Sequence, residues 1–232
     1  MDAINRVMKI AKDIVNKGGV AMAVSIDIAN AFNSLLWGKI HAALVRHRIP
    51  EYIRRVVRDY LKDRAIVYNV RNYLPLIKRF IERGVSQGSV LGPLLWNLGY
   101  DPVLGAAVPD GAEVLTYADD TLIIIGGSSW TRTLRAMEAA VAAVIREIRK
   151  LGLTVATNKT EAIWFHNLPQ NRKPPSKWLC VGRNRIRVGQ NLKYLGITLD
   201  ERLRFKTHLE TLRVKITRNA SYLGRILPNI IG

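Results

Sequence analysis

Apolar and polar residues follow one another along the chain with two different periods, which predict a mixed order of strands and helices. Short unbroken apolar runs predict buried strands, the first at residues 21–28, AMAVSIDI. Apolar residues three and four apart predict helices, one capped by Asn33 or Ser34 and another opened by Pro50. A third helix is expected across 134–151. This order predicts an α+β fold, a largely antiparallel sheet with helices packed on one face.

The other expected elements are shorter. They are a first helix ending at Gly18–Gly19, strands at 65–70, 74–81, 186–188 and 194–199, short strands on both sides of 157–159, a helix entered near Pro93, and a basic helix from Arg202 onward.

The chain has 232 residues, of which 48% are hydrophobic. That content suits one large domain, or one domain with a small appendage.

One segment combines strand patterning with paired acids. Residues 113–127, EVLTYADDTLIIIGG, are two apolar runs around a tight acidic turn, which predicts a β-hairpin. Side chains alternate between the two faces of a strand, so Asp119 and Asp120 cannot both aim at one point. We therefore expect one of them to be a principal ligand and the other an auxiliary acid or a turn residue.

A third acid, Asp27, also ends an apolar strand. Strand-end carboxylates brought together repel and raise one another's pKa unless cations lie between them. Such hard oxygen ligands suit magnesium, and two Mg²⁺ ions about 4 Å apart would serve an in-line phosphoryl transfer. The alternative is that Asp119 and Asp120 only form the turn, because Asp favours turns. The basic chain and a glycine-rich segment before Pro93 favour the metal site.

The charge of the chain indicates its class of partner. There are 36 basic and 18 acidic residues, and 36 − 18 gives a net charge of +18. A solvated basic surface would account for part of this excess, but nucleic acid is the partner it favours, because no basic amphipathic membrane helix stands out. No apolar run is long enough to span a membrane, and the charged N-terminal segment is not a signal peptide. A single cysteine, Cys180, excludes an internal disulfide framework and fits an intracellular protein.

Five segments occur in the order of the palm motifs of a reverse transcriptase. They are VSIDIANAFNSLLWGKI, RGVSQGSVLGPLLWNLGYDPVL, LTYADDTLIII, GLTVATNKTEAIWF and LKYLGITLD. The chain resembles the enzymes of non-LTR (LINE-type) retrotransposons, particularly the lineage that inserts into insect ribosomal RNA genes. The resemblance implies a right-hand polymerase palm with part of the fingers over 1–200, and the start of a truncated thumb or connection segment over 201–232. It also implies an RNA template, a DNA primer, dNTP substrates and a nuclear location.

The resemblance also implies roles for residues of the first and third segments. Asp27 and Asp119 would hold the two Mg²⁺ ions with the backbone carbonyl of Ile28, and Asp120 would assist. Phe32 would pack under the sugar and block a 2′-hydroxyl, so the product would be DNA; the alternative is an ordinary core aromatic. The backbone amides of Ala29, Asn30 and Ala31 would meet the triphosphate.

Further roles are implied for the other segments, each with a plainer alternative. Gln87 and Gly88 would line the nucleotide and template pocket, or form an exposed turn. Lys159 would protonate the pyrophosphate leaving group, or be a surface lysine. The hairpin of Tyr194, Leu195 and Gly196 would grip the primer end, or be a core β-turn.

The sequence departs from the resemblance at several points. Ser86 stands where many relatives have proline, and Gly99 stands where an apolar residue is commoner and would loosen its helix by about 1 kcal/mol. Relatives also carry a preceding fingers region and an endonuclease domain, so we expect a truncated copy or a fragment of a longer polyprotein. The competing function is therefore a catalytically silent remnant that only binds nucleic acid. A ribonucleotide polymerase is disfavoured by Phe32.

Overall fold

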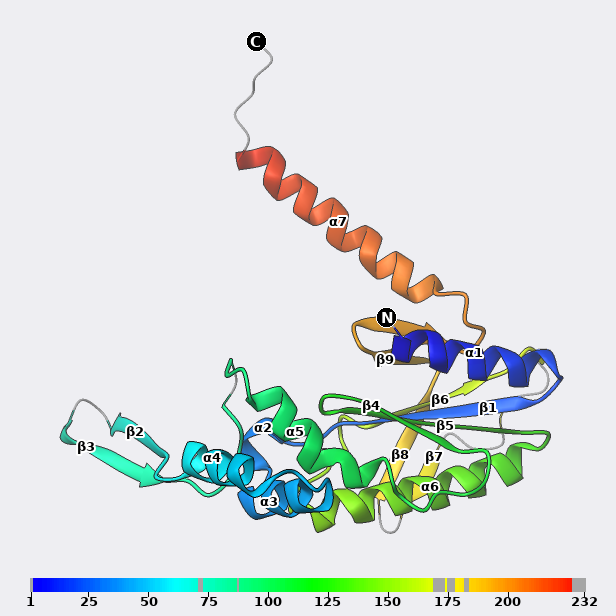
Figure 1. The fold of residues 1–232 in the computed structure, drawn as a ribbon. Helices are drawn as coiled ribbons and strands as arrows, with labels where there is room; N and C mark the ends of the chain where they lie inside the picture. The colour runs from blue at the N-terminus through cyan, green and yellow to red at the C-terminus, as the bar shows by residue number, and fades with distance from the viewer. Residues whose placement is uncertain are drawn as a thin grey trace.

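A six-stranded sheet forms the centre of the computed structural model, which describes residues 2–70, 73–86, 88–168, 174, 178–181 and 184–226 (Figure 1). The strand order across the sheet is β4-β5-β1-β6-β8-β7. In chain order the strands are β1 (Val20–Ile26), β4 (Glu113–Tyr117), β5 (Asp120–Gly127), β6 (Glu161–Phe165), β7 (Trp178–Val181) and β8 (Asn184–Gly189). All neighbouring pairs are antiparallel except β6 and β8. The predicted α+β class with a largely antiparallel sheet is confirmed.

Helices cover both faces of this sheet, not one face as expected. Alternate residues of β1 point in opposite directions, and Met22 and Val24 lie in the core under α6 (Trp130–Lys150). Ala21 and Ala23 face α1 (Asp2–Asn16) on the other side. These small side chains let α1 pack close to the sheet, and the sequence pattern did not reveal this second contact.

A group of shorter helices lies beside the sheet at the end where β1 leaves it (Figure 1). These helices are α2 (Ala31–Ser34), α3 (Trp37–Arg46), α4 (Glu51–Leu61) and α5 (Gly92–Tyr100), followed by the 3-10 turn η1 (Asp101–Val103). The expected cap at Asn33 or Ser34 is wrong, because both residues lie inside α2, and α3 begins after Leu36 without a side-chain cap. Two strands, β2 (Ala65–Val70) and β3 (Tyr73–Phe80), form a separate ribbon that extends from α4.

The C-terminal part begins with a small hairpin on the α1 face of the sheet. It is formed by β9 (Asn191–Tyr194) and β10 (Ile197–Asp200), with Leu195 and Gly196 in left-handed backbone conformations at the turn. The single strand expected at 194–199 is therefore a turn followed by a strand. Helix α7 (Lys206–Ile226) then projects away from the sheet, in contact with β10 (Figure 1). No helix of the described residues has the length and hydropathy needed to cross a bilayer.

Residues 157–159 are followed by a strand, β6, but not preceded by one. Before them, Val155 makes an isolated antiparallel pair with Ile28. The expectation of strands on both sides is therefore half right. The isolated pair matters for the site, because it attaches this loop to the residue that follows Asp27.

Gly99 has a packing role that the sequence did not show. A Cβ atom at this position would lie 2.7 Å from Cδ2 of Leu35, whose side chain is completely buried. Leu35 cannot retreat without disturbing the core, so a larger residue would overpack this contact. Gly99 therefore permits α5 to approach the segment between α2 and α3, and its expected cost to the helix stays a prediction.

Candidate active site

Three acids meet where β1 and β5 lie side by side. Asp27 follows the last residue of β1, and Asp120 is the first residue of β5. The last pair of the β1–β5 ladder is Ile26 with Thr121, so Asp27 and Asp120 are the residues next to this pair, and the charge of Asp27 acts on Asp120. Asp119 lies in the two-residue turn between β4 and β5, beside Ala118. The sequence therefore placed all three acids at one end of one sheet.

The turn that carries Asp119 has an unusual backbone. Ala118 has a φ of 55°, a left-handed conformation that costs a residue with a Cβ atom free energy. Such backbone strain persists only where the flanking strands fix the conformation of the turn, and it is more frequent at functional sites than elsewhere. Here the antiparallel pair of Tyr117 with Asp120 closes the turn directly.

Asp120 is repelled by the other two carboxylates. Partial burial raises the pKa of Asp120, and the negative charges of Asp119 and Asp27 raise it further. Within the described part of the chain, no lysine or arginine forms an ion pair with any of the three. The cluster therefore concentrates negative charge in a strongly basic protein, with no ion-paired cation among the residues that the structure describes.

The two adjacent acids raise the pKa values of tyrosines on two different elements. Burial raises the pKa of Tyr100 on α5, and the charge of Asp119 adds to this shift. Burial raises the pKa of Tyr194 on β9 to about 12, and there the charge of Asp120 contributes. Asp119 therefore affects a tyrosine of α5 and Asp120 a tyrosine of β9, and because Asp119 lies in the turn, strand alternation alone does not decide this difference.

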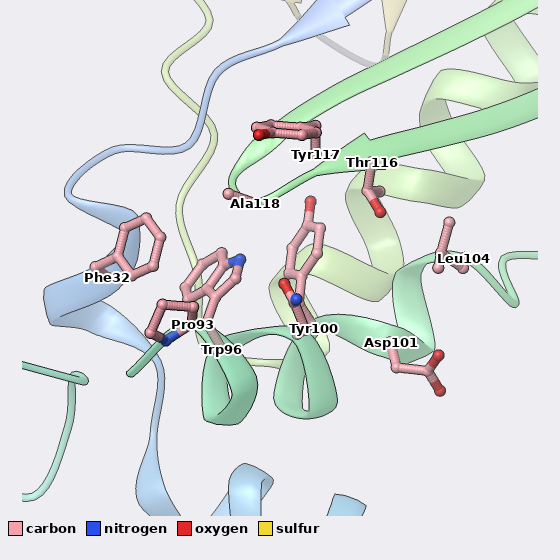
Figure 2. A pocket seen from close by; sticks show the side chains of 10 residues that line it. Phe32, Pro93, Trp96, Tyr100, Asp101, Leu104, Thr116, Tyr117 and Ala118 are labelled. Atoms are coloured by element: carbon pink, nitrogen blue, oxygen red, sulfur yellow. The ribbon is translucent and has the colours of Figure 1, made fainter. Parts of the chain in front are cut away.

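An aromatic ladder forms the α5 wall of the site (Figure 2). The ring centroids of Phe32 and Trp96 are 4.9 Å apart, and those of Trp96 and Tyr100 are 5.2 Å apart. The Tyr100 hydroxyl makes a buried 2.7 Å hydrogen bond with the Thr121 hydroxyl, next to Asp120. The sequence did not single out Trp96 or Tyr100; their spacing of four residues on α5 was the available signal.

This wall borders a pocket of about 540 Å³ between α5 and the β4–β5 turn (Figure 2). Phe32, Trp96, Tyr100, Tyr117 and Ala118 are among the residues that line it. The pocket therefore lies directly beside the turn that carries Asp119. Its size and its aromatic lining suit a planar ligand group with an apolar face.

The residues after Asp27 are held by backbone hydrogen bonds to the loop before β6. The amide of Ala156 donates to the Asp27 carbonyl at 2.9 Å, and the amide of Ala29 donates to the Thr154 carbonyl at 2.9 Å. In antiparallel pairing, the residue between two such bonds, Ile28, directs its own carbonyl away from that neighbour. The Ala29 amide differs from the expectation, because its bond to Thr154 leaves it no proton for a triphosphate.

Asn30 and Ala31 remain as amide donors for an anion. Asn30 adopts a left-handed backbone conformation (φ 50°) and Ala31 is the first residue of α2. The first amides of a helix have no partner within it. Two side chains of α2 fix Asn30: the Asn33 amide donates to its side-chain oxygen at 2.7 Å, and the Ser34 hydroxyl donates to its carbonyl at 2.8 Å.

Phe32 is half-buried and faces the pocket (Figure 2). Its carbonyl accepts a 2.7 Å hydrogen bond from the amide of Val85, two residues before Gln87. Gln87 lies outside the described residues. Gly88 has a φ of 82° and open space where a Cβ would lie, so its conformation, more than a close approach to other atoms, favours glycine. The structure therefore connects Phe32 to the loop predicted to line the nucleotide pocket.

Lys159 and the predicted primer-grip hairpin lie on two other sides of the acids. Lys159 is exposed, and its amide donates to Ala156, the residue bonded to Asp27. Tyr194 is buried, Leu195 is half-buried and Gly196 is exposed. The effect of Asp120 on the pKa of Tyr194 places this hairpin near the acid cluster.

Comparison with known proteins identifies the family. A model of the family described as reverse transcriptase (RNA-dependent DNA polymerase) matches residues 2–199. The chain belongs to this family.

The curated relatives of this reverse transcriptase chain are retrotransposon proteins of insects. It is 28% identical to the RNA-directed DNA polymerase from mobile element jockey of Drosophila melanogaster over 94% of the chain. It is 26% identical to a Pol polyprotein from type-1 retrotransposable element R1 of Bradysia coprophila over 89% of the chain, and 31% identical to the probable RNA-directed DNA polymerase from transposon BS of D. melanogaster over 81%. The chain covers 24%, 20% and 21% of these three relatives. The predicted family is confirmed.

Solved structures confirm the predicted right-hand polymerase fold. The apo telomerase of Candida tropicalis, truncated from its C-terminal domain, matches with a TM-score of 0.59 at 14% identity, over 86% of this chain and 38% of that one. The same telomerase in complex with a fragment of telomeric RNA matches with a TM-score of 0.58 at 12% identity, over 88% of this chain and 32% of that one. At this identity the likeness establishes the fold alone.

The acids of this reverse transcriptase chain fit magnesium in one respect only. Their oxygens are hard ligands, Asp120 is repelled by the other two, and no lysine or arginine of the described residues forms an ion pair with them. However, no three histidine, cysteine, aspartate or glutamate side chains of the described residues, these acids included, are grouped so that they could hold a metal ion by themselves. Mg²⁺ is commonly bound through one or two carboxylates together with substrate phosphates, so an open set of acids fits an ion that arrives with a nucleotide.

Asp120→Asn is expected to stabilise the fold at neutral pH. The pKa of Asp120 is raised above its ordinary value of 3.8, so the folded state binds its proton more tightly than the unfolded state does. The contribution of Asp120 to the free energy of unfolding is therefore at its full value below about pH 4 and decreases as the pH rises through the raised pKa. We expect the melting temperature at pH 7.5 to rise by about 2 °C, a modest value because the carboxylate is partly exposed. The gain should vanish near pH 4.

Asp110→Asn is the matched control for this measurement. Asp110 is an exposed carboxylate in the turn before β4. Its removal from a chain of net charge +18 should leave the melting temperature unchanged or lower it slightly. Differential scanning fluorimetry from pH 4 to 8 compares the two variants. An equal rise for both, or a rise for Asp120→Asn that persists at pH 4, would contradict the repulsion among the three acids.

Proposed function

We propose that this chain is the catalytic palm region of a retrotransposon polymerase that copies an RNA template into DNA. The observation that carries the proposal is the group of three carboxylates at the meeting of β1 and β5, which lacks a basic partner in the described chain and lies beside an aromatic-lined pocket. In this proposal residues 1–200 are the palm with part of the fingers, and residues 201–232 begin the thumb. The helix α7, which leaves the sheet and contacts β10 of the neighbouring hairpin, is compatible with that division.

The proposed reaction is attack by the primer 3′-oxygen on the α-phosphorus of a deoxynucleoside triphosphate. The new bond joins this oxygen to phosphorus, the bond to the β-phosphate oxygen breaks, and the 3′-hydroxyl proton leaves to solvent. Asp27 and Asp119, with the Ile28 carbonyl and assistance from Asp120, would hold two Mg²⁺ ions. When bound, these ions lower the pKa of the attacking hydroxyl and neutralise the departing pyrophosphate.

The other residues of the site bind and orient the substrates. The backbone amides of Asn30 and Ala31, at the start of α2, are available to donate hydrogen bonds to an anion such as the triphosphate. The Phe32 ring, supported by Trp96, would exclude a 2′-hydroxyl. Lys159, in the loop attached to Asp27, would give a proton to the pyrophosphate, and the hairpin of Tyr194, Leu195 and Gly196 would hold the primer end.

The net charge of +18 supports binding of an RNA–DNA hybrid through its phosphates. Binding to phosphates releases counterions, so the affinity for the hybrid should fall steeply with salt.

A primer-extension assay tests this proposal. We would use the purified chain and a chimera in which residues 2–199 replace the matching segment of the jockey polymerase, each with a DNA primer on an RNA template. Incorporation of dNTP that requires Mg²⁺ is the expected result. Filter binding of the same hybrid is measured beside it. Hybrid binding without incorporation in either protein would instead support the silent nucleic-acid-binding remnant.

A further inference from the structure

Arg64, which lies between α4 and β2, contacts the loop that precedes α5. The proposed mechanism places this loop at the nucleotide pocket but names no residue that fixes its position. We call this loop, residues 84–86 and 88–91, the serine loop. Arg64, just before β2, donates a hydrogen bond from Nη1 to the hydroxyl of Ser86. Its guanidinium carbon lies 4.4 Å from the centre of the Tyr60 ring on α4. No carboxylate of the described residues forms an ion pair with Arg64, so its charge is directed to the loop.

Ser86 is the centre of a small network. Its carbonyl accepts hydrogen bonds from the amide of Ser89 at 3.2 Å and from the hydroxyl of Ser89 at 2.8 Å. The Ser89 hydroxyl in turn accepts a 3.0 Å hydrogen bond from the amide of Gly92, the first residue of α5. Hydrogen bonds therefore link Ser86 through Ser89 to the start of α5, the helix that carries Trp96 and Tyr100.

The first residues of the serine loop are held from the other side. The amide of Gly84 donates to Leu35 at 2.8 Å, and the amide of Val85 donates to Phe32 at 2.7 Å. The Trp37 indole donates to the Gly84 carbonyl at 2.7 Å. No backbone hydrogen bond from the Ser86 amide to a described residue is present. Beyond Val85, Arg64 holds the Ser86 hydroxyl, the Tyr60 hydroxyl lies beside Ser89 and Ser86, and Leu91 packs against the core.

We propose that Arg64 is a positioning residue that fixes the serine loop relative to Phe32 and so sets the affinity for the incoming nucleotide. This inference rests on the proposed polymerase function. An arginine suits the task because its planar guanidinium can stack on Tyr60 and donate to Ser86 at once. Where proline would restrict the backbone of such a loop directly, a hydrogen bond restricts it here. Loss of the Arg64–Ser86 hydrogen bond would leave the three acids in place but would allow the serine loop to adopt several conformations.

Steady-state kinetics of the chimera test this role through KM and kcat. Arg64→Met and Ser86→Ala should each raise the KM for dNTP about ten-fold and change kcat less than about two-fold. The double variant should be no worse than either single one, because both remove the same contact. Arg79→Met is the matched control: Arg79 is an exposed cation of β3 on the same ribbon, and its loss should leave KM unchanged. Additive effects, or an equal effect of Arg79→Met, would overturn the proposal.

Hydrogen–deuterium exchange separates a failure of this inference from a failure of the proposed function. The measurement uses the 232-residue chain and requires no activity. Amides of the serine loop and of the first turn of α5 should exchange several-fold faster in Arg64→Met than in the wild-type chain, and at the wild-type rate in Arg79→Met. Unchanged exchange in Arg64→Met would refute the positioning role even if the chain polymerises. Faster exchange in an inactive chain would support the role and count against the proposed function alone.

Discussion

Asp119→Asn is expected to abolish nucleotide incorporation, by at least about 10³-fold, while binding of the RNA–DNA hybrid is retained. Asparagine preserves the shape of the side chain and the strained turn after Ala118 but removes the negative charge. The remaining carboxylates then repel less, and a divalent cation with its nucleotide phosphates loses one of its two principal ligands. Primer extension in the chimera measures the rate, and filter binding of the hybrid measures the affinity. The same loss is expected for Asp27→Asn.

Asp110→Asn serves again as the control, because it makes the same change of charge in an exposed turn outside the cluster. It should incorporate nucleotides at the unsubstituted rate. Asp120→Asn should lose less activity than Asp119→Asn, because Asp120 is assigned the auxiliary role. Incorporation by Asp119→Asn above background, or a ten-fold loss of hybrid affinity beside the loss of rate, would contradict the assignment of Asp119 as a metal-holding acid.

Local patterns predicted the parts of the fold that bring the acids together. The apolar runs of 113–127 gave the β4–β5 hairpin, and the run that ends at Asp27 gave β1, because both strands are buried and their side chains alternate. The pairing of β1 with β5, which brings the acids at their ends together, is shown by the structure and was not predicted by the local patterns. The different roles expected for Asp119 and Asp120 stay a prediction, although each raises the pKa of a tyrosine on a different element.

Tertiary contacts decided the features that the sequence did not reveal. Ala21 and Ala23 do not form a strong apolar pattern, yet their small size is what lets α1 cover the second face of the sheet. Gly99 was expected to weaken a helix, because helix propensity considers the helix alone and not the Leu35 side chain packed against it. The contact of Arg64 with Ser86 joins residues 22 positions apart, and no periodic pattern relates them.

Phe32→Val is expected to relax the discrimination between deoxyribonucleotides and ribonucleotides by about 10–100-fold. The Phe32 ring faces the pocket beside the β4–β5 turn, and Trp96 behind it, with centroids 4.9 Å apart, prevents its retreat (Figure 2). Valine would leave space where a 2′-hydroxyl could lie. The ratio of kcat/KM for dNTP to that for the matching ribonucleotide, measured in the chimera, reports the change. Phe32→Tyr, which keeps the ring, should retain the discrimination.

Loss of packing is the competing explanation for any effect of Phe32→Val, because the ring also supports Trp96 and through it Tyr100. A general loosening would lower kcat/KM for both kinds of nucleotide and leave their ratio unchanged, whereas removal of a steric block raises kcat/KM for the ribonucleotide itself. Phe80→Val is the control for loss of a phenyl ring, since Phe80 lies on β3 with 66% of its surface exposed. Its ratio should stay at the unsubstituted value. A ribonucleotide kcat/KM that does not rise in Phe32→Val would show that Phe32 is a core aromatic and that sugar selection, if present, resides elsewhere in the site.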